Sequence, residues 1–287
     1  MKTILVTGVG GPAGQNVTRL LLEQGYAVVG TDMRDAPVAG ITFRRVRAAN
    51  DPSFLDELCR LAAQANVELV IPTVTEELSI VAESWSKRSE IPAMIGPHQA
   101  VFTANDKYLT ADWLANWNVS VPRYCLPSQV KSPDKVSQTI GWPCLSKPRV
   151  GRGGRGVTVW EEKDWPSVAA LDDRFILQEF MSGADYAPNV LIGRDGKAVV
   201  IVIEKTKLKE GIVGNAAEVQ RAAAPDVAEL AVAAAKAMSF VGPLDIDVRR
   251  HADGKPAVLE INARFGANIA NASEILEAAL ADWGVAR

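Results

Sequence analysis

Leu244-Asp245-Ile246-Asp247-Val248-Arg249-Arg250 alternates apolar and polar side chains, and so does Ala257-Val258-Leu259-Glu260-Ile261-Asn262. Alternation with a period of two is typical of a β-strand whose two faces meet different surroundings. Asp253-Gly254 lies between the two segments and is a preferred sequence for a two-residue type I′ turn. The pattern therefore predicts an antiparallel hairpin.

A turn centred on Asp253-Gly254 fixes which residues of this hairpin face each other. Asp247 then lies opposite Glu260, and Asp245 lies opposite Asn262, all on one face. The other face is apolar and packs as core, through the pairs Ile246–Ile261 and Val248–Leu259.

Two carboxylates directly opposite each other repel, so the pairing of Asp247 with Glu260 needs compensation. A divalent cation bound by carboxylate and amide oxygens would supply it. Mg²⁺ with phosphate ligands fits best, with Mn²⁺ as the second choice. Protonation of one acid, or neutralisation by Arg249 or Arg264, is the alternative compensation.

A second informative stretch is Cys-Leu-Ser-Lys-Pro-Arg-Val-Gly-Arg-Gly-Gly-Arg-Gly-Val, residues 144–157. Its apolar start ends at Lys147, and a second strand follows it at 157–160. Bare backbone N–H groups of a glycine loop can wrap an anion, and a lysine at its base adds a charge. We therefore expect a lid that binds phosphate, with a solvated hairpin as the alternative. Its glycines are Gly151, Gly153, Gly154 and Gly156.

Residues 1–103 alternate apolar runs with helical patterns, which predicts a small doubly wound α/β domain with a parallel sheet. The strands are expected at 4–6, 27–30, 69–71 and 93–95, and the helices at 15–24, 53–65 and 76–86. The turn Thr7–Gly14 satisfies the Gly-x-Gly-x-x-Gly/Ala pattern, and Asp32 ends the second strand. This turn predicts either a dinucleotide site or a tight turn that needs glycine for packing.

Residues 104–180 predict a compact α+β lobe that carries the glycine-rich lid, and residues 181–287 a second lobe that carries the acid hairpin. Asn105 or Asp106 is expected to cap a helix that runs to about Trp117. Lys107 then lies in the first turn, where a nearby anion would favour it. Lys205–Gln220 is expected to be polar and mobile.

Composition narrows the classes of partner and compartment. A net charge of −3 gives no excess of basic residues that could bind phosphate backbones, so we expect no nucleic-acid partner. Three widely spaced cysteines suggest neither a disulfide framework nor a metal motif, and fit a reducing cytoplasm. No signal peptide or membrane-spanning run is recognised, so we expect no membrane partner.

The lysine and glycine loop, the acid hairpin and the N-terminal α/β unit occur in an order that resembles the ATP-grasp superfamily. The chain looks most like single-module relatives of the carbamoyl phosphate synthase large chain and pyrrolysine-biosynthesis-type ligases. The resemblance covers nearly the whole chain. It implies an α/β protein with an ATP-grasp fold of two α+β lobes, preceded by a pre-ATP-grasp domain.

The resemblance also implies roles for individual residues. The phosphates of ATP would be bound by Lys107, Lys147 and the glycine lid. The adenine would be read by Glu179 and the backbone at Phe180 and Met181, and the ribose by Asp185. The metal ligands would be Asp247, Glu260 and Asn262, within the signature Glu260-Ile261-Asn262-Ala263-Arg264. Arg264 would stabilise an acyl phosphate, and Lys205 and Lys207 would contact the transferred phosphate or the substrate carboxylate.

Several positions depart from the family pattern. Asp185 stands where relatives often carry the longer Glu, and Pro188-Asn189 where many have a polar residue and Asp. Lys205 and Lys207 lie in a region where relatives often carry arginine. Ala263 replaces the more usual Pro after Asn262.

The resemblance implies an ATP- and Mg²⁺-dependent ligase that activates a small-molecule carboxylate as an acyl phosphate and joins it to an amine or similar nucleophile. A homodimer is a family-level expectation. One alternative is an NAD(P)-dependent Rossmann oxidoreductase or epimerase, although no Tyr-x-x-x-Lys pair is present. A non-catalytic ATP-binding protein is the second alternative.

Overall fold

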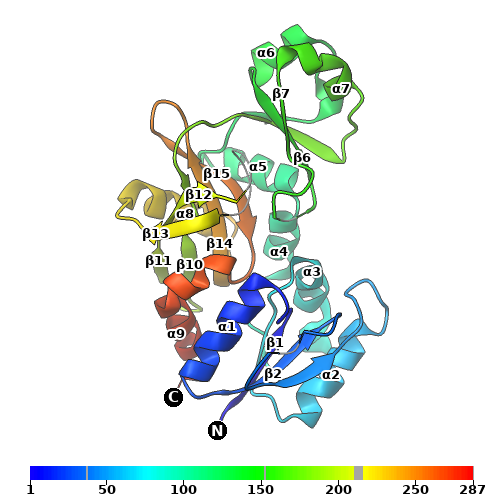
Figure 1. Ribbon diagram of the computed structural model, residues 1–287, viewed down its shortest axis with the longest axis vertical. Helices are drawn as coiled ribbons and strands as arrows, with labels where there is room; N and C mark the ends of the chain where they lie inside the picture. The colour runs from blue at the N-terminus through cyan, green and yellow to red at the C-terminus, as the bar shows by residue number, and fades with distance from the viewer. Residues whose placement is uncertain (37, 152, 210–215, 287) are drawn as a thin grey trace.

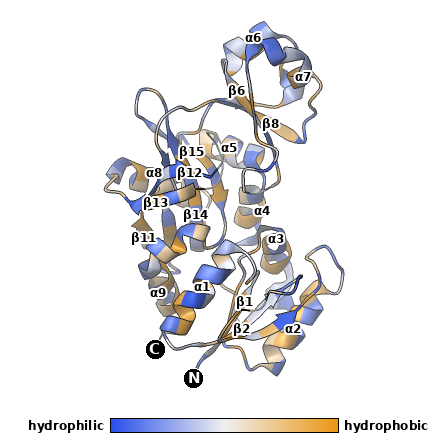
Figure 2. Cartoon of the chain, in the orientation of Figure 1, coloured by the Kyte–Doolittle hydropathy of each residue, from blue (hydrophilic) through white to orange (hydrophobic). Residues whose placement is uncertain are grey.

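The computed structural model describes residues 1–36, 38–151, 153–209 and 216–286. Figure 1 shows an N-terminal domain at one end of the long axis, a small lobe at the other end, and a larger lobe between them. Apolar residues gather along the strands and on the sides of the helices that face them (Figure 2). Arg152, which belongs to the predicted lid, lies outside the described residues.

The N-terminal domain is a four-stranded parallel sheet of order β3-β2-β1-β4, which confirms the predicted parallel α/β unit. Its strands are β1 (Thr3–Thr7), β2 (Ala27–Asp32), β3 (Thr42–Arg45) and β4 (Leu69–Ile71). Its helices are α1 (Pro12–Glu23), α2 (Phe54–Gln64) and α3 (Thr75–Ser84), with a 3₁₀ turn at Trp85–Lys87. The sequence pattern missed β3 because it is a short, largely exposed edge strand. The expected strand at 93–95 is only a bridge between Val70 and Ala93.

The glycine turn of this domain serves close packing. A Cβ at Gly14 would lie 2.2 Å from the carbonyl oxygen of Gly8, so only glycine lets α1 approach β1 this closely. The Asp32 carboxylate accepts hydrogen bonds from the backbone N–H of Gly10 at 3.0 Å and of Arg34 at 3.1 Å. Asp32 therefore stabilises its own turn, which supports the packing interpretation over a dinucleotide site.

The small lobe is a four-stranded antiparallel sheet of order β5-β8-β6-β7. Its strands are β5 (Tyr124–Cys125), β6 (Cys144–Pro148), β7 (Thr158–Trp160) and β8 (Phe175–Glu179). Its helices are α6 (Pro133–Thr139) and α7 (Trp165–Ala169), with 3₁₀ turns at Pro127–Gln129 and Glu162–Asp164. β6 carries Lys147 and ends where the glycine loop begins.

The C-terminal lobe is built on a larger sheet in which β14 pairs with β15 on one edge and with β9 and β10 on the other. Its strands are β9 (Asp185–Tyr186), β10 (Asn189–Ile192), β11 (Ala198–Ile201), β12 (Ile203–Leu208), β13 (Ala216–Arg221), β14 (Gly242–Arg250) and β15 (Pro256–Asn262). β12 and β13 form an antiparallel pair within the segment expected to be mobile. The described residues of this segment are therefore ordered into two strands, and most of their polar side chains are partly or fully exposed.

Helices from the C-terminal lobe, together with two helices that precede the small lobe in the chain, cover both faces of this sheet (Figure 1). They are α4 (His98–Asn105), α5 (Lys107–Asn116), α8 (Pro225–Ala237) and α9 (Ser273–Asp282), with a 3₁₀ turn at Ala267–Asn271. Leu114 of α5 and Ala231 of α8 share one core with Ile246. Leu276 of α9 packs instead with Leu20 and the N-terminal sheet, which joins the two domains through a common core.

The β14–β15 hairpin, which carries the acids, has the predicted register at the acidic residues. Asp247 pairs with Glu260, and Asp245 with Asn262. The predicted pair Val248–Leu259 is wrong, because a bulge between Asp247 and Val248 pairs Val248 with Val258. The predicted two-residue turn is also wrong, since Arg250 pairs with Pro256 and the connection runs from 251 to 255. The longer turn shifts the register by one residue, and the bulge restores it at the acids.

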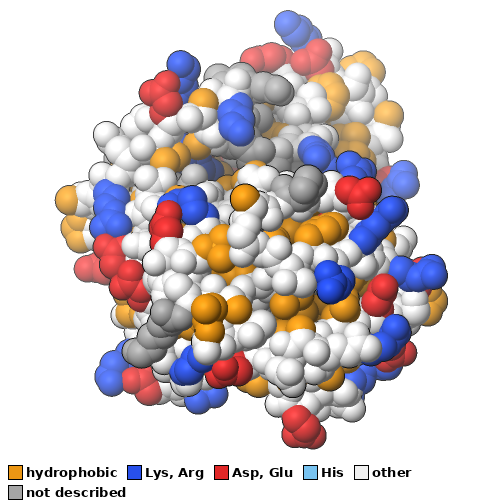
Figure 3. Space-filling model, turned by 60° about the horizontal axis from the view of Figure 1, so that its bottom comes forward, with side chains coloured by type: hydrophobic (Ala, Val, Ile, Leu, Met, Phe, Trp, Pro, Cys, Tyr) orange, Lys and Arg blue, Asp and Glu red, His pale blue; other side chains and the backbone are white. Residues whose placement is uncertain are grey.

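The surface shows no single-sign field on the face drawn in Figure 3, where basic and acidic side chains are interspersed with apolar ones. Among the described residues, none of the helices combines the length and the hydropathy that a membrane span requires.

Gly14→Ala is expected to destabilise the protein by about 2 kcal/mol or more, because its Cβ would overlap the Gly8 carbonyl and overpacking has costs of this size. Urea denaturation measures the change in the free energy of unfolding. The control is Gln15→Ala at the neighbouring exposed position, where we expect a change within about 0.5 kcal/mol. Equal stability of the two variants would contradict the packing role of Gly14.

Candidate active site

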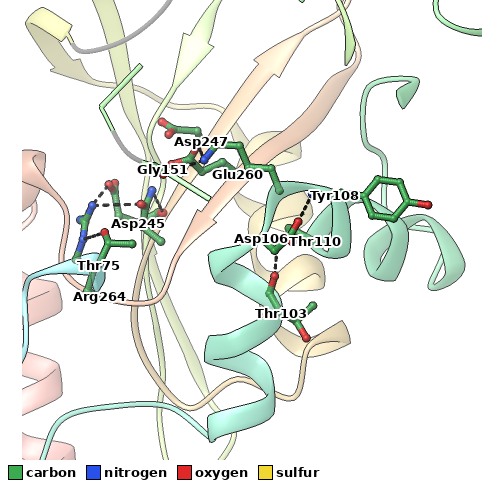
Figure 4. Close-up of polar contacts among 12 residues, drawn as sticks. Thr75, Thr103, Asp106, Tyr108, Thr110, Gly151, Asp245, Asp247, Glu260 and Arg264 are labelled. Atoms are coloured by element: carbon green, nitrogen blue, oxygen red, sulfur yellow. Dashed lines mark hydrogen bonds and ion pairs between the residues drawn. The ribbon is translucent and has the colours of Figure 1, made fainter. Parts of the chain in front are cut away.

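The polar face of the β14–β15 hairpin brings together acids from both of its strands (Figure 4). Asp245 and Asp247 project from β14, and Glu260 and Asn262 oppose them from β15. Asp185 belongs to the neighbouring β9, which pairs with β14 through Arg249. Burial and then the neighbouring Asp247 raise the pKa of Asp245 above its usual range. The lobe therefore concentrates negative charge where little water can screen it.

Lys205 neutralises part of this charge. Its Nζ lies 2.6 Å from Asp247 Oδ1 and 3.1 Å from Asp185 Oδ1, and its side chain is 9% exposed. Burial lowers its pKa, but the two carboxylates outweigh that effect and leave the pKa raised above the usual lysine value. Lys205 therefore stays charged and holds two strands together through their acids.

Lys107 reaches the same acids from the first turn of α5. Its Nζ lies 3.2 Å from Glu260 Oε2 and donates to the carbonyl oxygen of Gly151 at 2.9 Å. The predicted cap is Asp106, whose carboxylate accepts from the backbone N–H of Tyr108 and of Leu109. Arg149 binds the same carboxylate at 2.7 Å through Nη2. The cap therefore fixes Lys107 and ties the start of the glycine loop to the acids.

Lys147 is the third lysine of the cluster. It is 7% exposed at the end of β6, and burial lowers its pKa to about 8. Lys107 lowers this pKa further, whereas Glu260, Asp247 and Asp185 oppose the shift. The backbone also links the two predicted phosphate lysines, because the Lys107 N–H donates to the carbonyl oxygen of Arg149, two residues after Lys147, at 2.9 Å.

Arg264 leaves β15 beside the acids and reaches the N-terminal domain (Figure 4). It donates to the Asn262 side-chain oxygen at 3.2 Å and to the Thr75 hydroxyl at 3.4 Å. Its Nη1 lies 3.9 Å from Asp245 Oδ2. Thr75 begins α3 just beyond β4, at the carboxyl end of the parallel sheet, where α/β domains bind ligands. Arg264 therefore lies at the seam between two domains.

The predicted adenine hinge follows β8. The Glu179 carboxylate accepts from the Arg123 guanidinium at 3.0 Å, and His251 Nδ1 lies 3.5 Å from it. Burial raises the pKa of Glu179, but the hydrogen bonds from Arg123 leave it lowered. Phe180 lies under the Arg249 guanidinium at 5.9 Å from the ring centroid, and Met181 is buried. Polar and cation–π contacts therefore fix the hinge that connects the two lobes.

Lys207 and the glycine loop are the remaining predicted elements. Lys207 makes an exposed ion pair with Glu218 at 3.2 Å and does not join the cluster, because the register of β12 shifts after Lys205. In the glycine loop, Gly153, Gly154 and Gly156 have positive φ angles of 65°, 72° and 73°. These angles suit glycine and give the loop a course that other residues would strain.

Three contributing residues were missed from sequence as site residues. Asp245 appeared only as the partner of Asn262, although the alternation placed it on the polar face. Asn189 lies beside Asp245 across β10 and β14. The sequence could not show that Asn189 lies beside Asp245, because this contact depends on the order of the strands in the sheet. Thr75 gave no signal, since its contact with Arg264 joins distant segments.

The donor set suits a hard divalent cation. Asp247, Glu260 and Asn262 offer carboxylate and amide oxygens on one face, and the two acids are now balanced by lysines. Within the described ranges, no group of three or more His, Cys, Asp and Glu side chains is arranged as a metal site. The predicted set contains only two acids, so protein oxygens would fill part of the coordination sphere and phosphate the rest.

Comparison with known families agrees with this geometry. The profile of the ATP-grasp domain matches residues 104–268, which is more than half of the 287-residue chain. The chain therefore belongs to the ATP-grasp family, as the motif set predicted. No curated protein matches it in sequence.

Solved structures share the fold over nearly the whole chain. N5-carboxyaminoimidazole ribonucleotide synthetase from Thermotoga maritima is 19% identical, with a TM-score of 0.72 over 100% of this chain and 77% of that one. L-amino acid ligase from Bacillus licheniformis is 16% identical, with a TM-score of 0.74 over 96% and 70%. Biotin carboxylase from Campylobacter jejuni is 16% identical, with a TM-score of 0.73 over 100% and 72%. At these identities the likeness establishes the fold.

Lys205→Met should destabilise the protein by about 3 kcal/mol, because it leaves two largely buried carboxylates without their shared cation. Urea denaturation at neutral pH provides the measurement. Lys207→Met, two residues along the same strand, is the matched control and should change stability by about 0.5 kcal/mol at most, since its ion pair is exposed. A mild effect at both positions would show that Lys205 does not hold the acids together.

The lowered pKa of Lys147 predicts a pH dependence of anion binding. The lysine is charged below its pKa of about 8 and loses its proton above it. Affinity for ATP should therefore weaken as pH rises through about 8, whereas Lys147→Arg, which stays charged, should bind with a flat pH profile. Isothermal titration between about pH 6.5 and pH 9.5 tests this. A flat wild-type profile would contradict a phosphate role for Lys147.

Proposed function

We propose that this chain is an ATP- and Mg²⁺-dependent ligase that activates a small-molecule carboxylate as an acyl phosphate and joins it to an amine or similar nucleophile. The observation that carries the proposal is the convergence of Lys107, Lys147 and Lys205 on the acids of the β14–β15 hairpin. Phosphoryl transfer demands positioning and charge neutralisation more than a protein nucleophile. A buried set of lysines and acids meets that demand.

The lysines would change partners when nucleotide binds. Lys107 and Lys205 now balance Glu260 and Asp247. When phosphate enters, it competes for these ammonium groups and frees the carboxylates as ligands. Lys147 adds a third charge from the small lobe. Asp247, Glu260 and Asn262 would hold the cation, which supplies neutralisation of the phosphate charge when bound.

The other predicted residues complete the nucleotide site. Phe180 and Met181 would present backbone groups to the adenine, with Glu179 beside them, and Asp185 would take the ribose. The contact between Lys205 and Asp185 must then be exchanged as well. The loop from Gly151 to Gly156 would close over the phosphates and exclude water from the acyl phosphate.

Arg264 is the residue that would meet the acid substrate. Its guanidinium lies beside the proposed metal ligands and points to the seam with the N-terminal domain. A fixed positive charge there would orient a carboxylate for attack on the terminal phosphate of ATP and then stabilise the acyl phosphate. The phosphate would leave when the nucleophile attacks the acyl carbon.

The chemistry of the substrates suggests the remaining partners. Mn²⁺ would serve in place of Mg²⁺, since both prefer oxygen ligands. We infer a cytoplasmic enzyme that acts on small molecules, with a homodimer as its proposed assembly. ADP release upon addition of candidate acids and amines tests the function, and a chain that binds ATP–Mg²⁺ without turnover would instead be a nucleotide-binding protein.

Glu260→Gln should lower the rate of ADP formation by about 100-fold or more, because a neutral amide replaces a carboxylate ligand of the cation that would neutralise the phosphates. Glu218→Gln is the control, since Glu218 is an exposed acid of β13 paired with Lys207. A coupled ADP assay measures the rate, and thermal unfolding checks that both variants fold. Wild-type activity in Glu260→Gln would refute the assignment of Glu260 to the metal site.

A further inference from the structure

Two acceptor oxygens beside the proposed metal ligands lack a hydrogen-bond donor. They are Asn189 Oδ1 and Asp245 Oδ1, and within the described residues neither has a hydrogen-bond partner. Asn189 is 1% exposed. Buried acceptors without a donor cost free energy, so their retention points to a partner that the protein itself does not supply.

The sheet register places these two side chains side by side. Asn189 pairs with Asp245 across β10 and β14, and the neighbouring pair is joined by the hydrogen bond from Ile246 N–H to the Pro188 carbonyl. Hydrogen-bonded and non-bonded pairs alternate in antiparallel sheets, so Asn189 and Asp245 form a non-bonded pair. Side chains of such pairs are closest, which makes the two oxygens a joint acceptor.

The surrounding donors are already engaged. Asn189 Nδ2 donates to the carbonyl oxygen of Ala187 at 3.1 Å. Asn262 Nδ2 donates to the backbone carbonyl of Asp245 at 3.2 Å, and the Asn262 oxygen accepts from Arg264. Arg264 Nη1 lies 3.9 Å from Asp245 Oδ2, beyond hydrogen-bond distance. A donor is therefore still needed at Asp245.

A ligand can reach this carboxylate. The Asp245 side chain is 13% exposed, so part of it is open to solvent, and the terminal torsion of aspartate is soft enough for a bound ligand to turn the carboxylate. Gly266 passes directly over it, because a Cβ there would lie 2.2 Å from the carboxyl carbon. On another side, Arg264 Nη1 lies 3.9 Å from Asp245 Oδ2, and Arg264 Nε donates to the Thr75 hydroxyl, so the carboxylate has a cation beside it at the seam between the domains.

A guanidinium and a carboxylate set next to each other match a zwitterion. The carboxylate of a ligand would pair with Arg264, and an ammonium close to that carboxylate would donate to Asp245 and Asn189. An ammonium has three donors, enough for both acceptors. We propose that Asp245 and Asn189 select an amino acid as the acid substrate. This inference rests on the proposed ligase function, since it assigns the carboxylate that the enzyme activates.

The test compares amino acids with their des-amino counterparts. Wild-type enzyme with ATP and Mg²⁺ is given each standard amino acid, and separately the carboxylic acid that lacks its amino group, always with the same excess of hydroxylamine, so that every assay contains the same nucleophile. We expect ADP release with an amino acid at a kcat/KM about 10- to 100-fold above that of its des-amino counterpart, the scale of a lost charge-assisted hydrogen bond. Asp245→Asn should remove this preference, whereas Asp253→Asn, in the exposed turn of the same hairpin, should keep it.

The outcomes separate this inference from the function it rests on. Des-amino acids that release ADP as well as amino acids would overturn the inference and leave the ligase function intact. Release with neither class would overturn the inference, and the ligase function would fall as well if no other carboxylate and amine released ADP. If Asp245→Asn weakens Mn²⁺ binding in the absence of any acid, Asp245 is a metal ligand and the inference fails. Should Asp245→Asn fail to fold, the wild-type comparison alone still decides.

Discussion

Like charges packed on one face of a sheet are the constraint on which the rest of the structure depends. Asp185, Asp245, Asp247 and Glu260 come from three strands, and none can move away without breaking the sheet. Their repulsion is opposed by cations delivered from other parts of the fold. Lys205 comes from the adjacent β12, Lys107 from a helix terminus and Lys147 from the other lobe. The two lobes are thus held together by the charges that a nucleotide would rearrange.

This arrangement accounts for several local features at once. Asp106 caps α5 and binds Arg149, so the helix terminus and the strand that leads to the glycine loop move as one. Lys107 then meets Glu260 and the loop carbonyl of Gly151 together. On the far side, Arg264 connects the acids to Thr75. In the proposed function, the nucleotide and the acid substrate would therefore meet at the same strand, β15.

The sequence was enough to predict the paired acids, but not all of the residues that surround them in the fold. Alternation and a glycine turn were enough to pair Asp247 with Glu260, and the family motifs identified Lys107 and Lys147. The predicted turn was wrong and would have shifted the pairing of the strands by one residue. The bulge beside Val248 restores the predicted pairing at the acids. Neither Asn189 nor Thr75 could be found, because their neighbours depend on sheet order and domain packing. Lys205 and Lys207 looked equivalent until a register shift separated them.

The most direct test of the account is the thermal stability of the wild-type protein with ATP–Mg²⁺, with ATP alone and with NAD. A ligand that binds only the folded state raises the unfolding temperature, and at a fixed ligand concentration the rise grows with the logarithm of its affinity. The account predicts a rise with ATP that is larger when Mg²⁺ is present, and no rise with NAD. Stabilisation by NAD without any by ATP–Mg²⁺ would contradict it.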